Sequence, residues 1–207
     1  MKILIVAATE LELEPLKRKL TESGQNHELE FITTGVGMVN MTYALTKKSV
    51  QGGFDLVLNV GIAGSLNEEM QLGTVVAISE DRFQELGVED GADFIPADKL
   101  DLIKSNEVVP MNPLIRHPFT LVKAISVNKV HGDDETILNL KSSCDAQIES
   151  MEGAAFYYVC NQEGLKCLQV RAVSNMVERR NRSAWDIPLA LDALSDAIVT
   201  LLEGLPE

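Results

Sequence analysis

The sequence predicts an α/β fold, a three-layer α/β/α sandwich built on a mixed, largely parallel central sheet. Short aliphatic runs alternate along the chain with longer segments whose apolar residues recur every three or four positions, the pattern of strands alternating with helices. The first run is apolar throughout, as in a strand covered on both faces. The chain has 207 residues, of which 45% are hydrophobic, so we expect one domain spanning residues 1–207.

The predicted strands are short and rich in β-branched and aliphatic residues. In chain order they are residues 2–8, 29–34, 55–60, 74–79, 119–127, 146–151 and 167–174. Residues 80–118 have weak periodicity and several prolines, and we expect them to form a long excursion over the surface.

The predicted helices lie between several of these strands and have an apolar stripe at helical spacing. They are residues 9–20, 38–51, 134–142, 153–163 and 187–205. The first begins with Thr9 at the N-cap and acidic residues in the first turn, where the helix dipole favours them. The last has Asp186 as its cap and Pro188 in the first turn, where proline is tolerated.

The composition argues against several classes of partner. Acidic residues outnumber basic ones by 31 to 18, and a net charge of −13 repels nucleic acid and anionic membranes. No apolar run reaches the ~20 residues that cross a bilayer, and the opening segment is shorter and less basic than a secretory signal. The three cysteines have no C-x-x-C spacing, which favours reduced thiols and a cytoplasmic protein.

Neither a metal nor an organic cofactor is expected. The three histidines do not cluster in sequence with the cysteines, so the spacing of a structural zinc site is absent. The segment TTGVGMVN (33–40) resembles a dinucleotide-binding loop but lacks its third glycine.

Four strand ends place polar residues and glycines together, and ligands of such sheets bind at the carboxyl ends of the strands. These motifs are AATELE after the first strand, NVGIAGS (59–65), ESMEGAA (149–155) and AVSNMVE (172–178). We expect Gly61 and Gly64 in a tight turn, which can cradle a phosphate or a sugar or only reverse the chain. Glu152 can bind two vicinal hydroxyls, or it is only an acidic residue favoured by a helix N-terminus.

Taken together, the four motifs resemble the nucleoside phosphorylase and nucleosidase superfamily, especially the bacterial methylthioadenosine/adenosylhomocysteine nucleosidases. They occur in the same order and at roughly the same spacing, over nearly the whole chain. The resemblance implies a nucleoside phosphorylase-like fold, a small nucleoside as substrate and a homodimer in which the neighbouring subunit helps to close the pocket.

The resemblance also implies roles for individual residues. Glu12 matches the general base that activates water, and Glu152 matches the residue that binds the ribose hydroxyls with help from the backbone of Met151. Asn175 stands where the family usually has an aspartate facing the purine. The remaining residues that the resemblance places at the substrate are Ile62, Ala63, Gly64 and Ser174. Of these, Ile62 stands where relatives often have a small or hydroxyl residue, which puts a side-chain contact from that position in doubt.

The asparagine points to a particular leaving base. A 6-oxopurine has acceptors at both O6 and N7, and the amide NH₂ of Asn175 carries two donors, whereas an ionised carboxylate carries none. We therefore expect hypoxanthine rather than adenine, although asparagine also caps turns. Within the superfamily, SN followed by an arginine-rich segment and a W-x-I-P helix start resembles the futalosine hydrolases of the alternative menaquinone pathway.

The substrate of the futalosine hydrolases joins a hypoxanthine nucleoside to a benzoate through a carbon chain. The arginine-rich segment contains three candidates for binding the benzoate carboxylate: Arg179, Arg180 and Arg182. The alternative is that these arginines pair with neighbouring acidic residues or lie at a subunit interface. The resemblance does not identify the residues that stack on the base. Our hypothesis is that they lie in residues 128–134, which include His131.

Water is the expected nucleophile. A phosphorylase holds phosphate with cationic side chains, but the first loop here is acidic and GIAGS has no cation. In the predicted reaction the ribosyl carbon gains oxocarbenium character, Glu12 draws a proton from water, and the donor that protonates the departing base is unassigned. The alternatives are a methylthioadenosine-type nucleosidase, a purine nucleoside phosphorylase, or a module that binds nucleosides without turnover.

Overall fold

The computed structural model describes residues 1–24, 26–91, 93–100, 108–110 and 117–206 and confirms the predicted α/β sandwich. An eight-stranded sheet runs in the order β10-β4-β8-β9-β3-β1-β2, with β7 added beside β4. Because β10 also pairs with β3, the strands β3, β10, β4, β8 and β9 form a closed ring from which β1 and β2 extend. Five of the strand pairings are parallel and three are antiparallel, so the sheet is mixed and largely parallel.

The strands and helices follow the predicted order. The strands of the large sheet are β1 (Lys2–Ala7), β2 (Glu28–Thr33), β3 (Leu56–Ser65), β4 (Val75–Phe83), β7 (Val108–Pro110), β8 (Thr120–Ser126), β9 (Ile148–Ser150) and β10 (Cys167–Met176). The α-helices are α1 (Glu10–Ser23), α2 (Met38–Ser49), α3 (Asp134–Ser143), α4 (Gly153–Gln162) and α5 (Ile187–Glu203). None of these described helices is long and apolar enough to cross a membrane.

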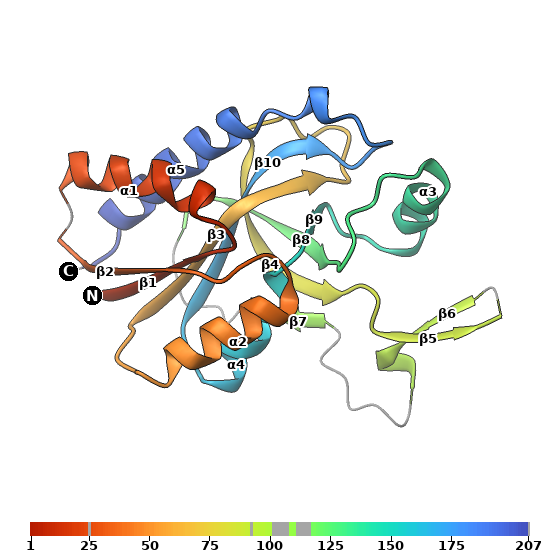
Figure 1. The fold of residues 1–207 in the computed structure, drawn as a ribbon, viewed down its shortest axis with the longest axis horizontal. Helices are drawn as coiled ribbons and strands as arrows, with labels where there is room; N and C mark the ends of the chain where they lie inside the picture. The colour runs from red at the N-terminus through yellow and green to blue at the C-terminus, as the bar shows by residue number, and fades with distance from the viewer. Residues whose placement is uncertain (25, 92, 101–107, 111–116, 207) are drawn as a thin grey trace.

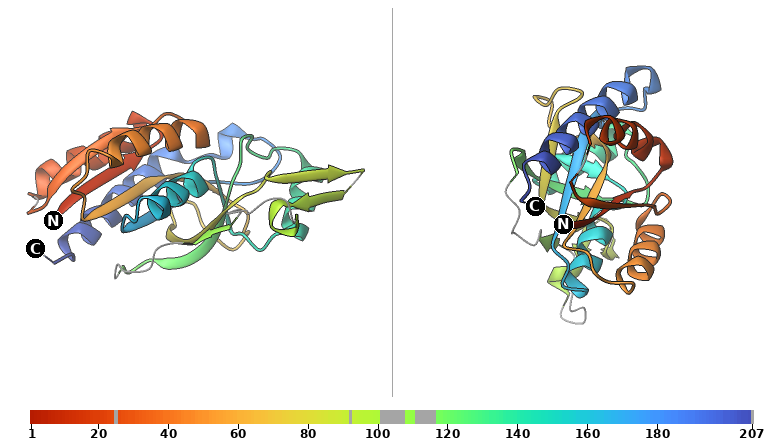
Figure 2. Two further views of the ribbon diagram at one scale, coloured as in Figure 1. Left: turned by 90° about the horizontal axis from the view of Figure 1, so that it is seen from below. Right: turned by 90° about the vertical axis from the view of Figure 1, so that its left-hand side faces the viewer.

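Helices cover both faces of the sheet (Figures 1 and 2). On one face α1 packs with α5, and on the other α2 packs with α4. Strand β1 shows why its sequence is apolar throughout: Ile3 and Ile5 belong to the core beneath α1 and α5, while Leu4 and Val6 belong to the core beneath α2 and α4. Alternate side chains of one strand thus enter two different cores.

The helix caps were predicted correctly at both ends of the chain. Thr9 occupies the N-cap of α1, and Asp186 caps α5 by accepting a hydrogen bond from the N–H of Leu189 over 3.0 Å. Pro188 lies in the first turn of α5, as expected.

The expected tight turn at GIAGS is wrong. Strand β3 continues through this motif to Ser65, and neither Gly61 nor Gly64 has a positive φ angle. Glycine is needed for space instead: a Cβ atom on Gly61 would lie 2.7 Å from Glu12 Oε1, and one on Gly64 would lie 2.9 Å from Val177 Cγ2. These glycines allow side chains to lie directly against the strand.

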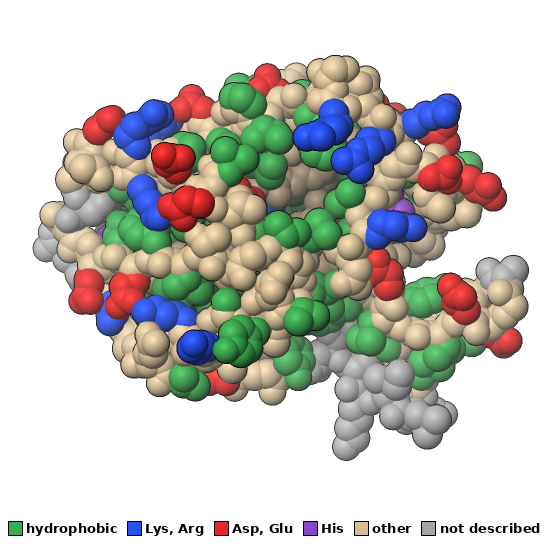
Figure 3. Space-filling model, in the orientation of Figure 1, with side chains coloured by type: hydrophobic (Ala, Val, Ile, Leu, Met, Phe, Trp, Pro, Cys, Tyr) green, Lys and Arg blue, Asp and Glu red, His purple; other side chains and the backbone are tan. Residues whose placement is uncertain are grey.

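The predicted surface excursion at 80–118 is only partly right. Its first residues extend β4 to Phe83, and Asp81 is fully buried there. The hairpin of β5 (Gly87–Asp90) and β6 (Asp93–Pro96) then projects away from the body of the protein, as Figures 1 and 3 show, followed by a 3₁₀ helix at Ala97–Lys99. Residues 101–107 and 111–116 lie outside the described residues.

Candidate active site

A cavity of about 350 Å³ lies at the ends of β1, β3, β9 and β10. Eight of the eleven residues predicted for the site line it: Glu12, Ile62, Ala63, Gly64, Met151, Glu152, Ser174 and Asn175. The structure adds wall residues that the sequence analysis did not identify, including Thr9, Val36, Glu149 and Trp185. Residues more than 100 positions apart in the sequence therefore meet in one cavity.

The carboxylate of Glu12 is held in one orientation at the cavity wall. Glu12 lies in the first turn of α1, where its Oε2 accepts hydrogen bonds from the N–H and the hydroxyl of Thr9, at 2.9 and 2.8 Å. Its Oε1 accepts a third bond from the N–H of Ile62 in β3, at 3.1 Å. The backbone of Ile62 thus contributes to the site, whatever the role of its side chain.

Glu152 is the N-cap residue of α4 and is 8% exposed. Its Oε1 accepts a hydrogen bond from the N–H of Gly37 over 2.8 Å. Gly37 has a φ angle of +95°, which favours glycine, so the G-x-G motif before α2 serves to orient this carboxylate. Burial raises the pKa of Glu152, and the bond from Gly37 lowers it in part.

Arg171, which the sequence analysis missed, lies beneath both carboxylates. It is 2% exposed, and its Nη1 donates to the carbonyl oxygens of Asn59 and Val170 at 3.4 and 3.2 Å. Burial lowers its pKa, while the charges of Glu152 and Glu12 raise it. The available signal was a single charged residue in a strand that is buried from Cys167 to Ser174, since a buried arginine requires compensating charge.

A β-bulge presents Asn175 to the cavity. In the pairing of β10 with β3, Val173 lies opposite Ala63 and Asn175 lies opposite Gly64, which leaves Ser174 as an extra residue. Ser174 Oγ lies 2.9 Å from Asn175 Oδ1. Asn175 Nδ2 donates one hydrogen bond to the carbonyl oxygen of Met176, at 2.9 Å. One N–H of the amide therefore remains for a ligand, rather than the two expected to face O6 and N7.

A smaller pocket of about 150 Å³ adjoins the cavity and shares several wall residues with it, among them Gly64, Glu149, Asn175 and Trp185. Arg180 and His131 also line this pocket. Of the three predicted arginines, only Arg180 lies there, and Arg179 and Arg182 line neither hollow.

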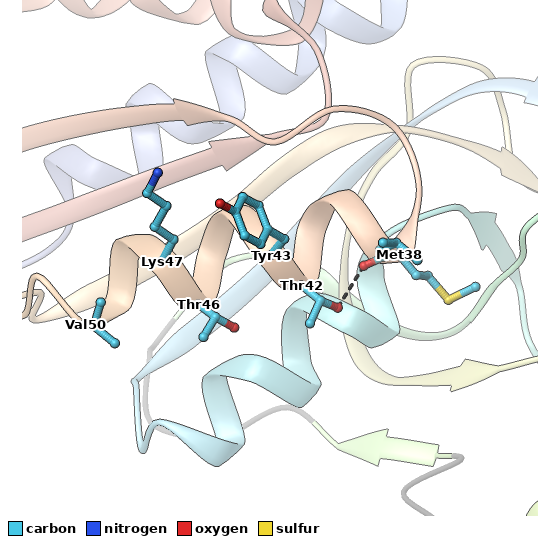
Figure 4. Close-up of a pocket in the computed structure, with 7 residues that line it drawn as sticks. Met38, Thr42, Tyr43, Thr46, Lys47 and Val50 are labelled. Atoms are coloured by element: carbon cyan, nitrogen blue, oxygen red, sulfur yellow. Dashed lines mark hydrogen bonds between the residues drawn. The ribbon is translucent and has the colours of Figure 1, made fainter.

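A larger hollow of about 700 Å³ lies along the exposed side of α2, as Figure 4 shows. Its lining contains Tyr43, Lys47 and apolar residues but none of the predicted site residues. We therefore assign the chemistry to the cavity of about 350 Å³, where the buried carboxylates of Glu12 and Glu152 lie. Among the described residues, no three His, Cys, Asp or Glu side chains are grouped so that they could hold a metal ion.

The chain resembles known proteins over most of its length. A model of the phosphorylase superfamily matches residues 2–203. The chain is similar to the futalosine hydrolase of Thermus thermophilus, with 29% identity over 180 residues that cover 83% of this chain and 80% of that protein. It is also similar to the 5'-methylthioadenosine/S-adenosylhomocysteine nucleosidase of Haemophilus ducreyi, with 23% identity covering 99% of this chain and 98% of that protein.

A solved structure confirms the fold. The native futalosine hydrolase of Helicobacter pylori superimposes with a TM-score of 0.81 over 99% of this chain and 98% of that chain, at 17% sequence identity. At this identity the match concerns the fold alone.

Proposed function

Because the chain belongs to the phosphorylase superfamily, we propose that it is a nucleosidase that hydrolyses the N-glycosidic bond of futalosine. The products are hypoxanthine and dehypoxanthine futalosine, in the futalosine route to menaquinone. The observation that carries the proposal is that one cavity holds the Glu12 and Glu152 carboxylates together with the amide of Asn175. Similarity to named futalosine hydrolases and nucleosidases supports N-glycoside hydrolysis in general, and the amide supports the 6-oxopurine base.

Water as the nucleophile is supported by the charge of the cavity wall. None of the described residues that line the cavity is lysine or arginine, whereas three of them are glutamates: Glu12, Glu149 and Glu152. A phosphate dianion would be repelled by these carboxylates, but a carboxylate can accept a proton from water. Arg171 lies beneath the wall and donates to backbone carbonyls.

In the proposed mechanism the N-glycosidic bond lengthens first, and the ribosyl carbon gains oxocarbenium character. Glu152 binds the ribose hydroxyls, next to the backbone of Met151. Glu12 accepts the proton of the attacking water, which its three hydrogen bonds allow only from a fixed direction. Asn175 donates a hydrogen bond to the purine and stabilises the charge that develops on the leaving base, and the base anion then takes up a proton from water.

Asn175 supplies the base preference in this proposal. Its free N–H donates to O6 of a 6-oxopurine, whereas a 6-aminopurine presents a donor at the exocyclic nitrogen. N7 is an acceptor in both bases and does not discriminate between them. An unpaired polar group in a buried site costs about 1–3 kcal/mol, which corresponds to roughly a 5- to 150-fold preference.

Arg180 is the proposed partner of the substrate carboxylate, because it alone of the three arginines lines a pocket beside Asn175. Replacing Arg180 with alanine should raise KM for futalosine and leave KM for inosine, which has no carboxylate, unchanged. An equal rise for both substrates would instead place Arg180 at the base.

A homodimer is also proposed, formed through the exposed side of α2. Val39, Tyr43 and Val50 line the hollow and are 81%, 69% and 73% exposed. Figure 4 shows Tyr43 and Val50 on this side of α2. Val36, just before α2, is 50% exposed and lines the catalytic cavity, so a second copy on this surface would also cover the cavity mouth. Light scattering should give twice the monomer mass, and Val39→Asp should reduce it.

The activity is tested by incubating the protein with futalosine, methylthioadenosine and inosine, with and without phosphate, and measuring free base by chromatography. We expect hypoxanthine from futalosine without phosphate, and Glu12→Gln should abolish its release. Adenine from methylthioadenosine without hypoxanthine from futalosine would contradict the substrate. A requirement for phosphate would contradict hydrolysis, and release of no base would indicate a binding module. Asn175→Asp should shift the preference towards a 6-aminopurine.

A further inference from the structure

The sheet places a second polar side chain beside Asn175. In β3, Gly64 pairs with Glu149 of β9 on one side and with Asn175 of β10 on the other. Residues directly paired across a sheet point to the same face, and strands lie about 4.8 Å apart, so the Cα atoms of Glu149 and Asn175 lie roughly 10 Å apart. The residue between them is a glycine, and a Cβ atom added to it would lie 2.9 Å from Val177 Cγ2 and 3.1 Å from Asn175 Nδ2.

Both side chains reach the same space. Glu149 and Asn175 each line the catalytic cavity and the adjoining pocket, and so does Gly64. The space that the two hollows share is therefore bounded by the carboxylate of Glu149 on one side and the amide of Asn175 on the other.

Glu149 is a fixed hydrogen-bond acceptor. It is 4% exposed, and its Oε1 accepts a bond from the N–H of His131 over 3.0 Å. Its Oε2 is hydrogen-bonded to Nδ1 of the same histidine. An ionised carboxylate has about four acceptor positions, so about two remain after these bonds.

His131 is the group that orients this carboxylate. The hydrogen bond to Glu149 raises the pKa of the His131 ring, burial lowers it, and the charges of Glu149 and Glu85 raise it while that of Lys129 lowers it. When the ring donates from Nδ1, both oxygens of Glu149 act as acceptors, and a ligand meets them as acceptors too.

We propose that Glu149, positioned by His131, is a second base-recognition residue and accepts a hydrogen bond from N1–H of a 6-oxopurine. Asn175 donates to O6 of the same base, so the pair matches the N1–H donor and the O6 acceptor along one edge of hypoxanthine. In adenine N1 is an acceptor, and its lone pair would face the carboxylate. This assignment rests on the proposed function and adds to it a reason for base selectivity that is independent of Asn175.

If Glu149 and His131 had only a structural role, replacing them would affect base binding differently. If Glu149 and His131 only attached the loop of residues 128–134 to β9, replacing either residue would weaken the binding of every base alike. Selectivity between bases therefore distinguishes the two roles, whatever happens to the overall affinity.

The test measures the dissociation constants of hypoxanthine, adenine and 1-methylhypoxanthine by calorimetry. Wild-type protein should bind hypoxanthine at least 10-fold more tightly than either other base, because each lacks the N1–H donor. Glu149→Gln has the same shape and can donate to N1 of adenine, so it should reduce the ratio of hypoxanthine to adenine affinity at least 10-fold. The exposed Glu163→Gln is the matched control and should leave the ratio unchanged.

His131 is tested as a positioning residue by rescue. His131→Ala should reduce the selectivity ratio, and His131→Asn, which restores a side-chain N–H near the position of Nδ1, should recover most of it. Equal loss of affinity for all bases in Glu149→Gln would overturn the proposal. Equal binding of hypoxanthine and 1-methylhypoxanthine by the wild-type protein would also overturn it, and this second measurement does not require any variant to fold.

These readouts separate the two proposals. Free bases bind without turnover, so a protein that selects hypoxanthine through Glu149 but does not hydrolyse futalosine would contradict the proposed function alone. Hydrolysis of futalosine by a protein whose base selectivity is unaffected by Glu149→Gln would contradict this inference alone.

Discussion

Asp81 provides a quantitative test of the buried polar network beneath the site. It is fully buried, and its Oδ1 and Oδ2 accept hydrogen bonds from Ser126 Oγ at 2.9 Å and Gln169 Nε2 at 3.1 Å. Ser126 Oγ in turn accepts from the N–H of Ala154, in the first turn of α4, over 2.8 Å. Two hydrogen bonds thus connect Asp81 to the backbone of the first turn of α4, the helix whose N-cap residue is Glu152.

Burial raises the pKa of Asp81 from 3.8 to about 7. The folded state therefore binds the proton more tightly than the unfolded chain, and the stability that this adds at low pH is lost as pH rises from 3.8 towards 7. The contribution is RT ln[(1 + 10^(7 − pH))/(1 + 10^(3.8 − pH))], which gives about 2 kcal/mol at pH 5.5 and close to zero at pH 8.

Asp81→Asn removes this titration while keeping the shape of the side chain. The new amide can still accept from Ser126, and its NH₂ can donate to Gln169 Oε1 if that side chain turns over. Within the described residues Gln169 Oε1 has no hydrogen-bond partner at present. Urea unfolding followed by circular dichroism gives the free energy of unfolding at pH 5.5 and pH 8. Between these values the wild-type protein should lose about 2 kcal/mol more than the variant. Equal losses would show that Asp81 is ionised throughout and would refute the reasoning.

Three further predictions concern two glycines beside buried carboxylates, Gly61 and Gly153, and the ring of His131. Gly61→Ala places a Cβ atom 2.7 Å from the Glu12 carboxylate, so kcat should fall by roughly 10- to 100-fold in a steady-state assay while the melting temperature changes little. Gly153→Ala places one 2.1 Å from Asp81 Oδ2 in the core and should lower the free energy of unfolding by about 1–3 kcal/mol in urea; unchanged stability would show that the core relaxes. The raised pKa of His131 should appear as a ring titration above pH 6.5 by NMR, and the stability from its charged hydrogen bond should be present below that pH and lost as pH rises through the folded pKa.

The fold was predictable because its main signals are local. The alternation of strands and helices, the caps at Thr9 and Asp186, and the apolar first strand all follow from residues close together in sequence. The motifs at the strand ends were equally visible, because a parallel sheet brings the carboxyl ends of its strands to one edge. That rule places Glu12, Glu152 and Asn175 in one cavity before any coordinate is known.

The failures concern contacts between distant segments. A glycine pair that permits a turn and one that permits close approach look the same in sequence, and only the position of the Glu12 side chain shows which applies at Gly61. Arg171 was overlooked for a similar reason: its strand reads as apolar, and the carboxylates that balance its charge come from α1 and from the start of α4.

Register is the property that the sequence hides most completely, and base recognition depends on it. The bulge at Ser174 shifts the pairing of β10 by one residue, and without that shift Ser174, not Asn175, would lie opposite Gly64. Glu149 reaches the same row only because β9 pairs with β3 in antiparallel register at this glycine. The selectivity proposed for the site therefore depends on two strand pairings that converge on Gly64. Moving the bulge by inserting one residue next to Ser174 should abolish base selectivity even though every named side chain is retained, a result that base-binding measurements on the folded variant can check.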